Sequence, residues 1–576
     1  MRCVVVAGEI IYVDEYIAKI RVSKEIILEN DLMNLHLVFI DQNRRILGEV
    51  TQIDFNVVTI SLIGEFVGNN FILGIEKKPK FSSSIRTISK EEMDILVSSN
   101  DVRGFNFGFL PQYNNYPYRV NIDELFGHHI AIFGNTGSGK SYGLASIFQS
   151  LFYDKRNLMN NSRLILFDAH GEYKKSFGNL SICKVYDDER KLFIPLWLLD
   201  VYDIAMLLDA TKIEQIVLLE KVMRLVRIFS NNNNDVVALK NHLIAKAILS
   251  VMYSSKTSAK IRNEVFDILN LCSTKDISLS TSIKGIGYER SMKKCFEITR
   301  NGTFAEEILV TSFLETFIND DLEMYMDDSL KKYDLKMLED ALSFTIISEN
   351  ILINEGLSED ISILQVKLHS IATGEFSYLF DCTDFINENQ YVDNLYKNGN
   401  RYAQMVLINM GRYDEKIGKF IVKILSKFIF NYSKNLPVRA SMPFHIVLEE
   451  AHKYIYDDFN SSIMQYDIFS KIAKEGRKYG VILIIVTQRP TELNDNVISQ
   501  CSNFILFRTN HPNDIEFLKM TIPNVDSSII DKQKCIQPGN CIGFGRAFKL
   551  PMVIKLRIPN PTPLSDNANI YTIWKG

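Results

Sequence analysis

The sequence predicts an α/β protein in which a parallel sheet is preceded by a small β-barrel and interrupted by a bundle of helices. Three features predict this architecture: short β-rich segments at the start, apolar strands followed by helices further on, and a long stretch of helical periodicity between them. We expect a β-barrel at 1–85, the first part of the α/β core at 86–200, a mostly helical insertion at 201–400, the second part of the core at 401–555 and a C-terminal tail at 556–576.

The N-terminal region contains short runs that are rich in Val, Ile and Tyr and separated by turn residues, which is typical of β-strands. These runs are 10–13, 18–22, 35–40, 48–53 and 57–63. Strands this short cannot bury a wide sheet, so a small closed barrel is the natural arrangement. A three-stranded cap is the alternative that the sequence leaves open.

The core is predicted from continuous apolar runs that end at glycine-rich, acidic or polar turns. These runs are 129–133, 164–167, 405–408, 446–448 and 481–486. Apolar runs separated by helices are typical of parallel strands that are covered on both faces. Between about 200 and 400, apolar residues instead recur at three- and four-residue intervals, most clearly in 215–229 and 237–252. We therefore expect a helical insertion within the α/β core.

Composition sets limits on the class of protein. Of the 576 residues, 46% are hydrophobic and 23% charged, and the formal net charge is −4. This balance does not point to nucleic-acid binding, although a ring can confine basic loops to its channel. The eight cysteines form no CxxC pair, which favours reduced thiols over a zinc site. There is no secretory leader and no apolar run close to the roughly 20 residues of a membrane span, so we expect a cytoplasmic protein without a membrane segment.

The clearest motif matches the pattern GxxxxGK[ST] in full. It consists of Gly134, Asn135, Thr136, Gly137, Ser138, Gly139, Lys140 and Ser141. An apolar strand precedes it and a helix follows, so backbone N–H groups and the helix N-terminus can surround phosphate. Lys140 can reach the β- and γ-phosphates, and the Ser141 hydroxyl can bind Mg²⁺. The motif predicts that ATP and Mg²⁺ are the cofactors.

Two acids at the end of a later apolar strand form a second catalytic element. Glu449 and Glu450 follow the run 444–448. We assign Glu449 to Mg²⁺ or its water shell and Glu450 to orienting the attacking water, because such positioning supplies most of the catalysis in phosphoryl transfer. The alternative is an ordinary helix-capping pair. Beside a complete P-loop, the two acids favour ATP hydrolysis over kinase chemistry.

Two further polar residues lie near the predicted site. Gln488 follows the run 481–486 and Thr487, where it can hydrogen-bond the γ-phosphate or the attacking water; a polar strand end is the alternative. Arg477 belongs to the basic segment 474–480, and an Arg on an exposed helix end can reach the nucleotide of a neighbouring subunit. A solvated basic helix end explains Arg477 equally well.

In this order the motifs resemble those of HerA and its FtsK-related kin, which are RecA-like motors of the P-loop class. The segment 167–173 (FDAHGEY) resembles the family's acidic DxHGEY turn, 500–509 its later strand bearing an Arg, and 538–551 its closing hairpin. The N-terminal strands fit the small barrel that precedes the family's motor domain. The resemblance covers nearly the whole chain, most closely at 128–175 and 444–555.

The resemblance implies a RecA-like ATPase core, a homo-hexameric ring, double-stranded DNA in the central channel, and a nuclease or other effector protein docked on one face. It also implies that Arg477 is an arginine finger acting in trans and that Arg508 makes a second phosphate contact. The family pattern would place an Arg shortly before the P-loop, but His128 and His129 stand there. A phosphate contact in cis from this position is therefore doubtful, and we expect at least one of these histidines to be buried and hydrogen-bonded.

These features predict an ATP-hydrolysing ring motor that translocates double-stranded DNA with a partner nuclease or effector, in DNA end processing or anti-phage defence. The alternative is an ATP-dependent hexameric platform that activates or gates an effector enzyme with little DNA movement. A secretion ATPase of the conjugation type is disfavoured because no membrane segment is present.

Overall fold

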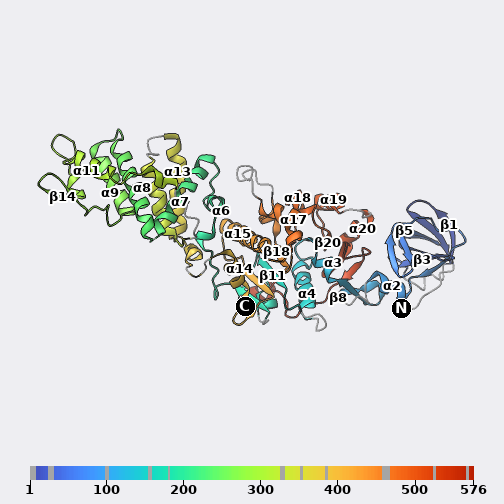
Figure 1. Ribbon diagram of the computed structural model, residues 1–576. Helices are drawn as coiled ribbons and strands as arrows, with labels where there is room; N and C mark the ends of the chain where they lie inside the picture. Colours follow the sequence, from blue (N-terminus) through green and yellow to red (C-terminus); the bar gives the residue numbers. More distant parts are fainter. Residues whose placement is uncertain are drawn as a thin grey trace.

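The computed structural model describes residues 8–23, 32–97, 103–153, 159–178, 182–231, 233–324, 331–349, 355–382, 384, 387–456, 467–522, 527–565 and 570–575. The molecule is elongated, with the N-terminal sheet at one end, the α/β core in the middle and most of the inserted helices at the other end (Figure 1). The confirmed fold class is therefore a P-loop α/β core with a curled N-terminal sheet and an inserted helical bundle.

The N-terminal sheet is antiparallel and strongly curled (Figure 1). Its strands are β1 (Gly8–Val13), β2 (Ile17–Val22), β3 (His36–Asp41), β4 (Arg44–Asp54), β5 (Val57–Val67), β6 (Asn70–Leu73) and β7 (Ser84–Thr87). They follow the order β1-β2-β5-β4-β3-β7, with β6 also paired to β5. The long β4–β5 pair contains two register shifts, and bulges of this kind bend a sheet. The sheet thus has the predicted barrel-like form rather than that of a three-stranded cap.

The central sheet has eleven strands in the order β12-β17-β11-β18-β19-β10-β20-β21-β22-β8-β9. The strands from β12 to β20 run parallel; they are β10 (Ile130–Phe133), β11 (Arg163–Asp168), β12 (Cys183–Tyr186), β17 (Met405–Asn409), β18 (Phe444–Glu449), β19 (Val481–Thr487) and β20 (Asn503–Leu506). An antiparallel extension adds β21 (Asn540–Gly545), β22 (Val553–Lys555), β8 (Gly104–Leu110) and β9 (Tyr116–Asn121). The central sheet therefore also contains two strands, β8 and β9, that precede the first of the predicted apolar runs, 129–133.

Both faces of the parallel sheet are buried, as the continuous apolar runs predict. Successive residues of β10 and β11 belong alternately to two hydrophobic cores. One core contains Ala131, Phe133, Ile165 and Phe167, and the other contains Ile130, Ile132, Leu164 and Leu166. The long helices around the sheet are α4 (Lys140–Phe152), α15 (Glu415–Lys434) and α17 (Ile468–Tyr479). Shorter ones are α2 (Lys90–Leu96), α3 (Ile122–Phe126), α5 (Lys174–Phe177), α18 (Asp495–Ile498), α19 (Pro512–Thr521), α20 (Ser527–Lys532) and α21 (Ile570–Lys575).

The helical insertion is the crossover between two neighbouring parallel strands, β12 and β17. Its helices are α6 (Val201–Leu207), α7 (Ile213–Ser230), α8 (Asn234–Met252), α9 (Ser258–Leu271), α10 (Met292–Cys295), α11 (Glu307–Glu315), α12 (Leu335–Ser348), α13 (Glu355–Thr373) and α14 (Glu388–Tyr396). Two short hairpins accompany them: β13 (Ser282–Lys284) with β14 (Glu289–Ser291), and β15 (Lys397–Asn398) with β16 (Arg401–Tyr402). Helices near the core share its hydrophobic cluster, whereas α8, α9 and α11 bury a separate one.

Cysteines, metal-binding groups and membrane-spanning helices can be assessed for the described residues. The seven cysteines among them are free, and Cys3 lies outside them. In this part of the chain no group of three or more His, Cys, Asp or Glu side chains could hold a metal ion. None of its helices combines the length and the apolar character that crossing a bilayer requires.

A buried charge cluster joins the insertion to the core. The Lys427 ammonium on α15 donates to Asp203 on α6 at 2.6 Å and to the α6 N-cap Asp200 at 2.5 Å. The side chains of Lys427 and Asp203 are only 11% and 7% exposed, so each depends on the other for charge compensation. Burial raises the pKa of Asp203 to about 6, and the nearby Lys427 opposes this rise.

Lys427→Met should lower the free energy of unfolding by about 3–5 kcal/mol, because it leaves the Asp203 carboxylate buried without a counter-charge. The matched control is Lys416→Met on the same helix, whose ion pair with Asp209 is half-exposed and should contribute about 1 kcal/mol or less. Chemical denaturation of both variants checks the difference. Equal losses would contradict the importance of the buried pair.

The loss of stability in the Lys427→Met variant should also depend on pH. The folded-state pKa of Asp203 lies above the ordinary value of 3.8, so folding favours the protonated acid and stability falls as the pH rises from about 4 through 6. Removing Lys427 removes an interaction that lowers this pKa, so the destabilisation should be larger at pH 8 than at pH 5.

Candidate active site

The P-loop lies between β10 and α4, as the motif predicts. Gly137 and Gly139 have φ values of 73° and 98°, in the left-handed region that favours glycine. A Cβ atom on Gly139 would lie 2.6 Å from the backbone nitrogen of Gly539, so this position also requires the absence of a side chain. The two glycines allow the loop to turn and let the chain around Gly539 approach it closely.

The Lys140 side chain lies over this loop. Its Nζ donates to the carbonyl oxygens of Gly134, at 2.6 Å, and Asn135, at 3.2 Å. Burial lowers the pKa of Lys140, while the charges of Glu450, Glu449 and, more weakly, Glu172 oppose this shift. The ammonium group therefore lies within the electrostatic reach of three acids, at the N-terminus of a helix where an anion is favoured.

The Glu449 carboxylate at the end of β18 is fixed by the turn after β11. Its Oε2 accepts from the backbone N–H of Ala169, and its Oε1 accepts from the Tyr173 hydroxyl, both at 3.0 Å. The Asp168 carboxylate in turn accepts from the backbone N–H groups of Glu172 and Tyr173. Burial, followed by the charges of Asp168 and Glu172, raises the pKa of Glu449 well above its usual range. This cluster of acids needs positive charge nearby in order to ionise fully.

Glu450 differs from Glu449 in its backbone and its contacts. It adopts φ 49° and ψ 48°, a left-handed conformation that is strained for a residue with a side chain and that is concentrated at functional sites. Its buried Oε2 makes no hydrogen bond and lies 3.4 Å from Nδ1 of His452. His452 Nδ1 lies 2.9 Å from the Thr487 hydroxyl. Glu450 thus offers the site an uncommitted carboxylate oxygen.

Gln488 directly contacts the P-loop, since its Oε1 accepts from the Thr136 hydroxyl at 2.6 Å. The parallel register pairs Phe133 with Thr487, so both strand ends reach the same edge of the sheet. Gln488, Glu449 and Glu450 line one pocket of about 610 Å³ together with the P-loop. The structure therefore brings most of the residues predicted for the site together.

Arg477 lies at the opposite edge of the sheet. It is exposed on the last turn of α17, immediately before β19 begins at Val481, whereas the P-loop lies beside the far end of β19. The length of β19 separates these edges by about 20 Å. Arg477 also lies near His128 and His129, which precede β10, and its charge helps to lower the pKa of both.

His129 is buried and hydrogen-bonded, as predicted for at least one of the two histidines. Its Nδ1 accepts from the backbone N–H of Leu483 at 2.9 Å, and its Nε2 lies 3.1 Å from the carbonyl oxygen of Ala473. Burial lowers the pKa of His129 to about 4, so the ring is neutral at physiological pH. It joins β10, β19 and α17 at the edge away from the P-loop.

Arg508, which is predicted to contact phosphate, is not among the described residues that line this pocket. Its carbonyl oxygen accepts from the Asn135 backbone N–H at 2.9 Å, so Arg508 supports the P-loop through its backbone. The cations that line the described pocket besides Lys140 are Lys555 and Arg557. No sequence motif singled out these two residues.

The segment 556–565, which was expected to belong to a tail, forms a wall of the pocket. Leu556, Arg557, Ile558, Pro559 and Ser565 line it. Gln149 on α4 holds the segment in place: its Oε1 accepts from the Asn560 N–H at 2.8 Å, and its Nε2 donates to the Pro561 carbonyl at 2.9 Å. The Leu564 N–H also donates to the carbonyl of Glu172, at 2.9 Å. We call residues 556–565 the C-terminal strap.

The donor set fits a nucleotide with a divalent cation. Burial raises the pKa of Glu172, and interaction with Ser141 opposes this rise. The Oε2 atoms of Glu172 and Glu450 are both buried without a hydrogen-bond partner. Mg²⁺ at phosphate sites is usually held by one or two protein oxygens, the phosphates and water, rather than by an all-protein cage.

A complete P-loop at the carboxyl edge of a parallel sheet, faced by two acids and a glutamine on adjacent strand ends, defines an ATPase of the P-loop class. Residues 105–429 match the family described as helicase HerA, central domain, which is more than half of the chain. The chain belongs to this family.

Individual relatives extend the similarity beyond the matched domain. The chain is 24% identical over 503 residues to the DNA double-strand break repair helicase HerA of Sulfolobus acidocaldarius, covering 86% of this chain and 77% of that protein. It is 21% identical to the HerA of Pyrococcus furiosus, covering 88% and 78%. Among solved structures, VirB4 of Thermoanaerobacter pseudethanolicus covers 80% of this chain and 97% of its own, with 14% identity and a TM-score of 0.43. The coupling protein TrwB covers 83% and 95%, with 10% identity and a TM-score of 0.43.

Gln149→Leu should weaken ATP binding by up to about thirtyfold, because it removes two hydrogen bonds that hold the strap against the pocket, each of which contributes about 1 kcal/mol. The control is Gln365→Leu on α13 in the insertion, whose amide makes one long contact with Ser343. Titration with a fluorescent ATP analogue measures both affinities. Wild-type affinity in the Gln149 variant would show that the strap does not complete the site.

Proposed function

We propose that this ATPase is an ATP-driven ring motor that moves double-stranded DNA and works with a partner nuclease or effector protein. The observation that carries the proposal is the position of Arg477 at the sheet edge away from its own P-loop. An exposed arginine there cannot reach its own nucleotide, but it can reach a nucleotide held by an adjacent copy of the chain. An active site shared between neighbours is what a ring motor requires.

In this proposal the residues predicted for the site have defined roles in phosphoryl transfer. The P-loop N–H groups and Lys140 bind the β- and γ-phosphates. Glu450 orients the attacking water, which agrees with its free carboxylate oxygen. Gln488 contacts the γ-phosphate or that water, and its hydrogen bond to Thr136 connects this contact to the P-loop.

Mg²⁺ would be held by Ser141, with Glu449 acting directly or through a bound water. The metal would neutralise charge that develops on the phosphates. The two hydrogen bonds that Glu449 accepts leave lone pairs on both of its oxygens, and burial, followed by the charges of Asp168 and Glu172, raises its pKa. A cation at this position would favour the ionised form of Glu449.

The names of two relatives, each a DNA double-strand break repair helicase, support DNA as the polymer on which this motor acts, and we propose that this DNA is double-stranded. We extend this to a homo-hexamer with DNA in its channel, on the family resemblance of the motifs. The chain's near-neutral charge is compatible with this arrangement, since only channel loops need to be basic. Arg508 is also proposed as a phosphate contact, because its backbone carbonyl places it next to the P-loop.

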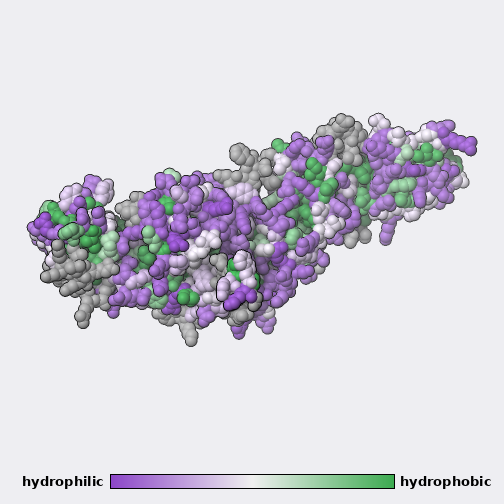
Figure 2. All heavy atoms as spheres, turned by 180° about the vertical axis from the view of Figure 1, so that it is seen from behind, coloured by the Kyte–Doolittle hydropathy of each residue, from purple (hydrophilic) through white to green (hydrophobic). Residues whose placement is uncertain are grey.

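Exposed hydrophobic side chains support a protein partner. The N-terminal sheet carries hydrophobic side chains on its surface, visible at the left of Figure 2, and Tyr16, Phe55 and Phe81 are 73%, 80% and 65% exposed. A surface of this kind is typical of a docking site. It fits a nuclease or effector in end processing or anti-phage defence, and it fits equally the second candidate function, an ATP-gated platform that activates an effector with little DNA movement.

Duplex DNA should stimulate ATP hydrolysis by an oligomer of defined mass, and the motor should bind unrelated duplexes with similar affinity. Because the contacts would be to phosphates, affinity should fall by about 10³-fold between about 50 and 200 mM salt if six or more phosphates are neutralised. Fluorescence anisotropy and an ATPase assay measure both. Hydrolysis indifferent to DNA but stimulated by a partner protein would favour the platform.

Arg477→Ala should fold and bind ATP but lose hydrolysis by about 10³-fold or more, which is the usual contribution of an arginine finger. Glu450→Gln should also bind ATP and hydrolyse it very slowly. In mixed rings, some interfaces combine the intact Glu450 of one mutant with the intact Arg477 of the other. Mixing two inactive proteins should therefore restore measurable ATPase activity.

Lys478→Ala, at the next position of the same exposed helix end, is the matched control and should keep wild-type turnover. Mass spectrometry establishes that subunits have exchanged. Mixed rings that remain inactive would rule out the action of Arg477 in trans and weaken the ring proposal.

A further inference from the structure

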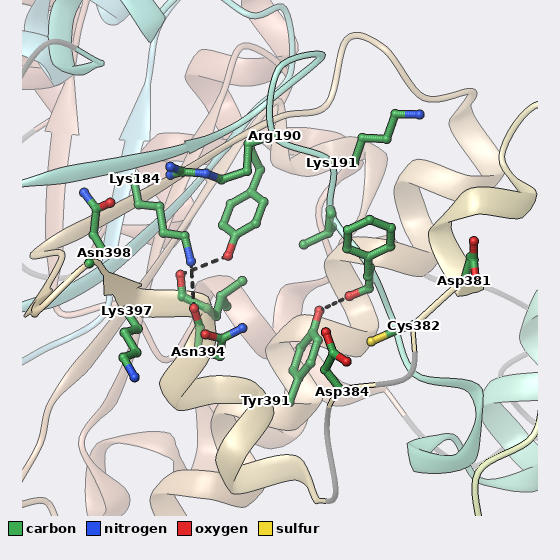
Figure 3. A pocket seen from close by; sticks show the side chains of 15 residues that line it. Lys184, Arg190, Lys191, Asp381, Cys382, Asp384, Tyr391, Asn394, Lys397 and Asn398 are labelled. Carbon is green, nitrogen blue, oxygen red and sulfur yellow. Dashed lines mark hydrogen bonds between the residues drawn. The ribbon is translucent and has the colours of Figure 1, made fainter.

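A second pocket, of about 450 Å³, lies at the outer edge of the central sheet (Figure 3). Its walls come from β12, the loop that follows it, α14, the β15 hairpin, and Asp381, Cys382 and Asp384, which precede α14. In the sheet, four strands separate β12 from the P-loop strand β10. The described linings of the two pockets share no residue.

This pocket has an excess of positive charge. Lys184, Arg190, Lys191 and Lys397 line it, against the two acids Asp381 and Asp384. In the part of the chain that the structure describes, none of these four cations forms an ion pair with a carboxylate. Two of them lie over aromatic rings: the Lys191 ammonium is 4.5 Å from the centre of the Tyr378 ring, and the Lys184 ammonium is 4.9 Å from that of Tyr186.

Lys184 is the best-positioned of these cations. Only 7% of it is exposed, and its Nζ donates to the Asn394 carbonyl oxygen at 2.7 Å. Burial, with a contribution from the charge of Arg190, lowers the pKa of Lys184 to about 8. An ammonium group that is fixed, buried and unpaired with any described carboxylate is stabilised by a bound anion.

The charges are distributed unevenly over the pocket. In Figure 3, Lys184, Arg190 and Lys397 lie on one side, and the two acids Asp381 and Asp384 lie on the opposite side together with Lys191. The basic end suits a phosphate group, and the acidic end suits hydroxyl or amino groups. An extended polyanion such as DNA fits poorly, because its next phosphates would meet the two acids.

We propose that this pocket binds a small phosphate-bearing ligand of nucleotide size, with the phosphate between Lys184, Arg190 and Lys397 and the remainder extending toward Asp381 and Asp384. The volume is within the range of small-molecule sites. Phe193, 37% exposed in the wall, supplies apolar surface for a base or other flat group. The inference is independent of whether the protein moves DNA.

The pocket is connected to the active site through the loop after β12. The Asp187 carboxylate accepts from the Arg190 N–H and pairs with Lys174 at 2.6 Å. Lys174 directly follows Tyr173, whose hydroxyl holds Glu449. A ligand that contacts Arg190 therefore acts on a loop braced against the catalytic turn, and its binding should change the rate of ATP hydrolysis.

Equilibrium dialysis of radiolabelled AMP and inorganic phosphate tests the proposal. Lys140→Ala protein serves as the background, because it weakens phosphate binding at the P-loop. We expect AMP binding to be saturable and tighter than phosphate binding. Arg190→Ala and Lys397→Ala should each weaken AMP binding about tenfold, because each variant removes one charge-assisted contact. Both side chains are exposed, so these variants should fold. Lys260→Ala, which removes an exposed lysine from the insertion, should leave binding unchanged.

Three results would overturn the proposal. The first is the absence of saturable AMP binding at millimolar concentration. The second is AMP binding that is weakened by neither Arg190→Ala nor Lys397→Ala. The third is displacement of AMP by a short DNA duplex, together with tighter binding of that duplex to the Asp381→Asn variant. The last result would assign the basic end to a nucleic-acid backbone.

Discussion

The fixed position of the Glu449 carboxylate is the constraint on which the active site depends. Its two hydrogen bonds come from the turn after β11, so the acid at the end of one strand is held by the end of its neighbour. This is possible because the parallel register pairs Phe167 with Leu448, which brings both strand ends to the same level. A shift of one residue would turn Glu449 to the other face of the sheet. The hydrophobic cores on the two faces therefore determine where the carboxylate oxygen atoms of Glu449 lie.

The local parts of the site could be predicted from the sequence. The P-loop, Glu449, Glu450 and Gln488 each follow an apolar run, and parallel strands bring such ends together. The structure shows this convergence directly, with Gln488 hydrogen-bonded to the loop. The general form of the fold could be predicted from the spacing of apolar residues. This spacing differs between a strand buried on one face, a strand buried on both faces and a helix with one buried side.

What the sequence did not predict depends on contacts between distant segments. β8 and β9 join the central sheet through β22, a pairing that no local pattern indicates. Gln149 resembles any polar residue of a helix, yet it is 5% exposed and holds a strap about 400 residues away. The sequence identified Glu172 only as part of the segment 167–173. The structure shows that one of its oxygens is buried without a partner and that its charge acts on Lys140.

The strap has a consequence for the order in which the molecule becomes functional during synthesis. The phosphate-binding loop is made early, but one wall of its pocket comes from residues 556–565. A nascent chain that has emerged only as far as β20 has the loop and both acids, but it lacks the surface that closes over a bound nucleotide. The protein should therefore acquire its full affinity for ATP only after residues 556–565 have been synthesised. This delay would keep incomplete chains from competing for nucleotide.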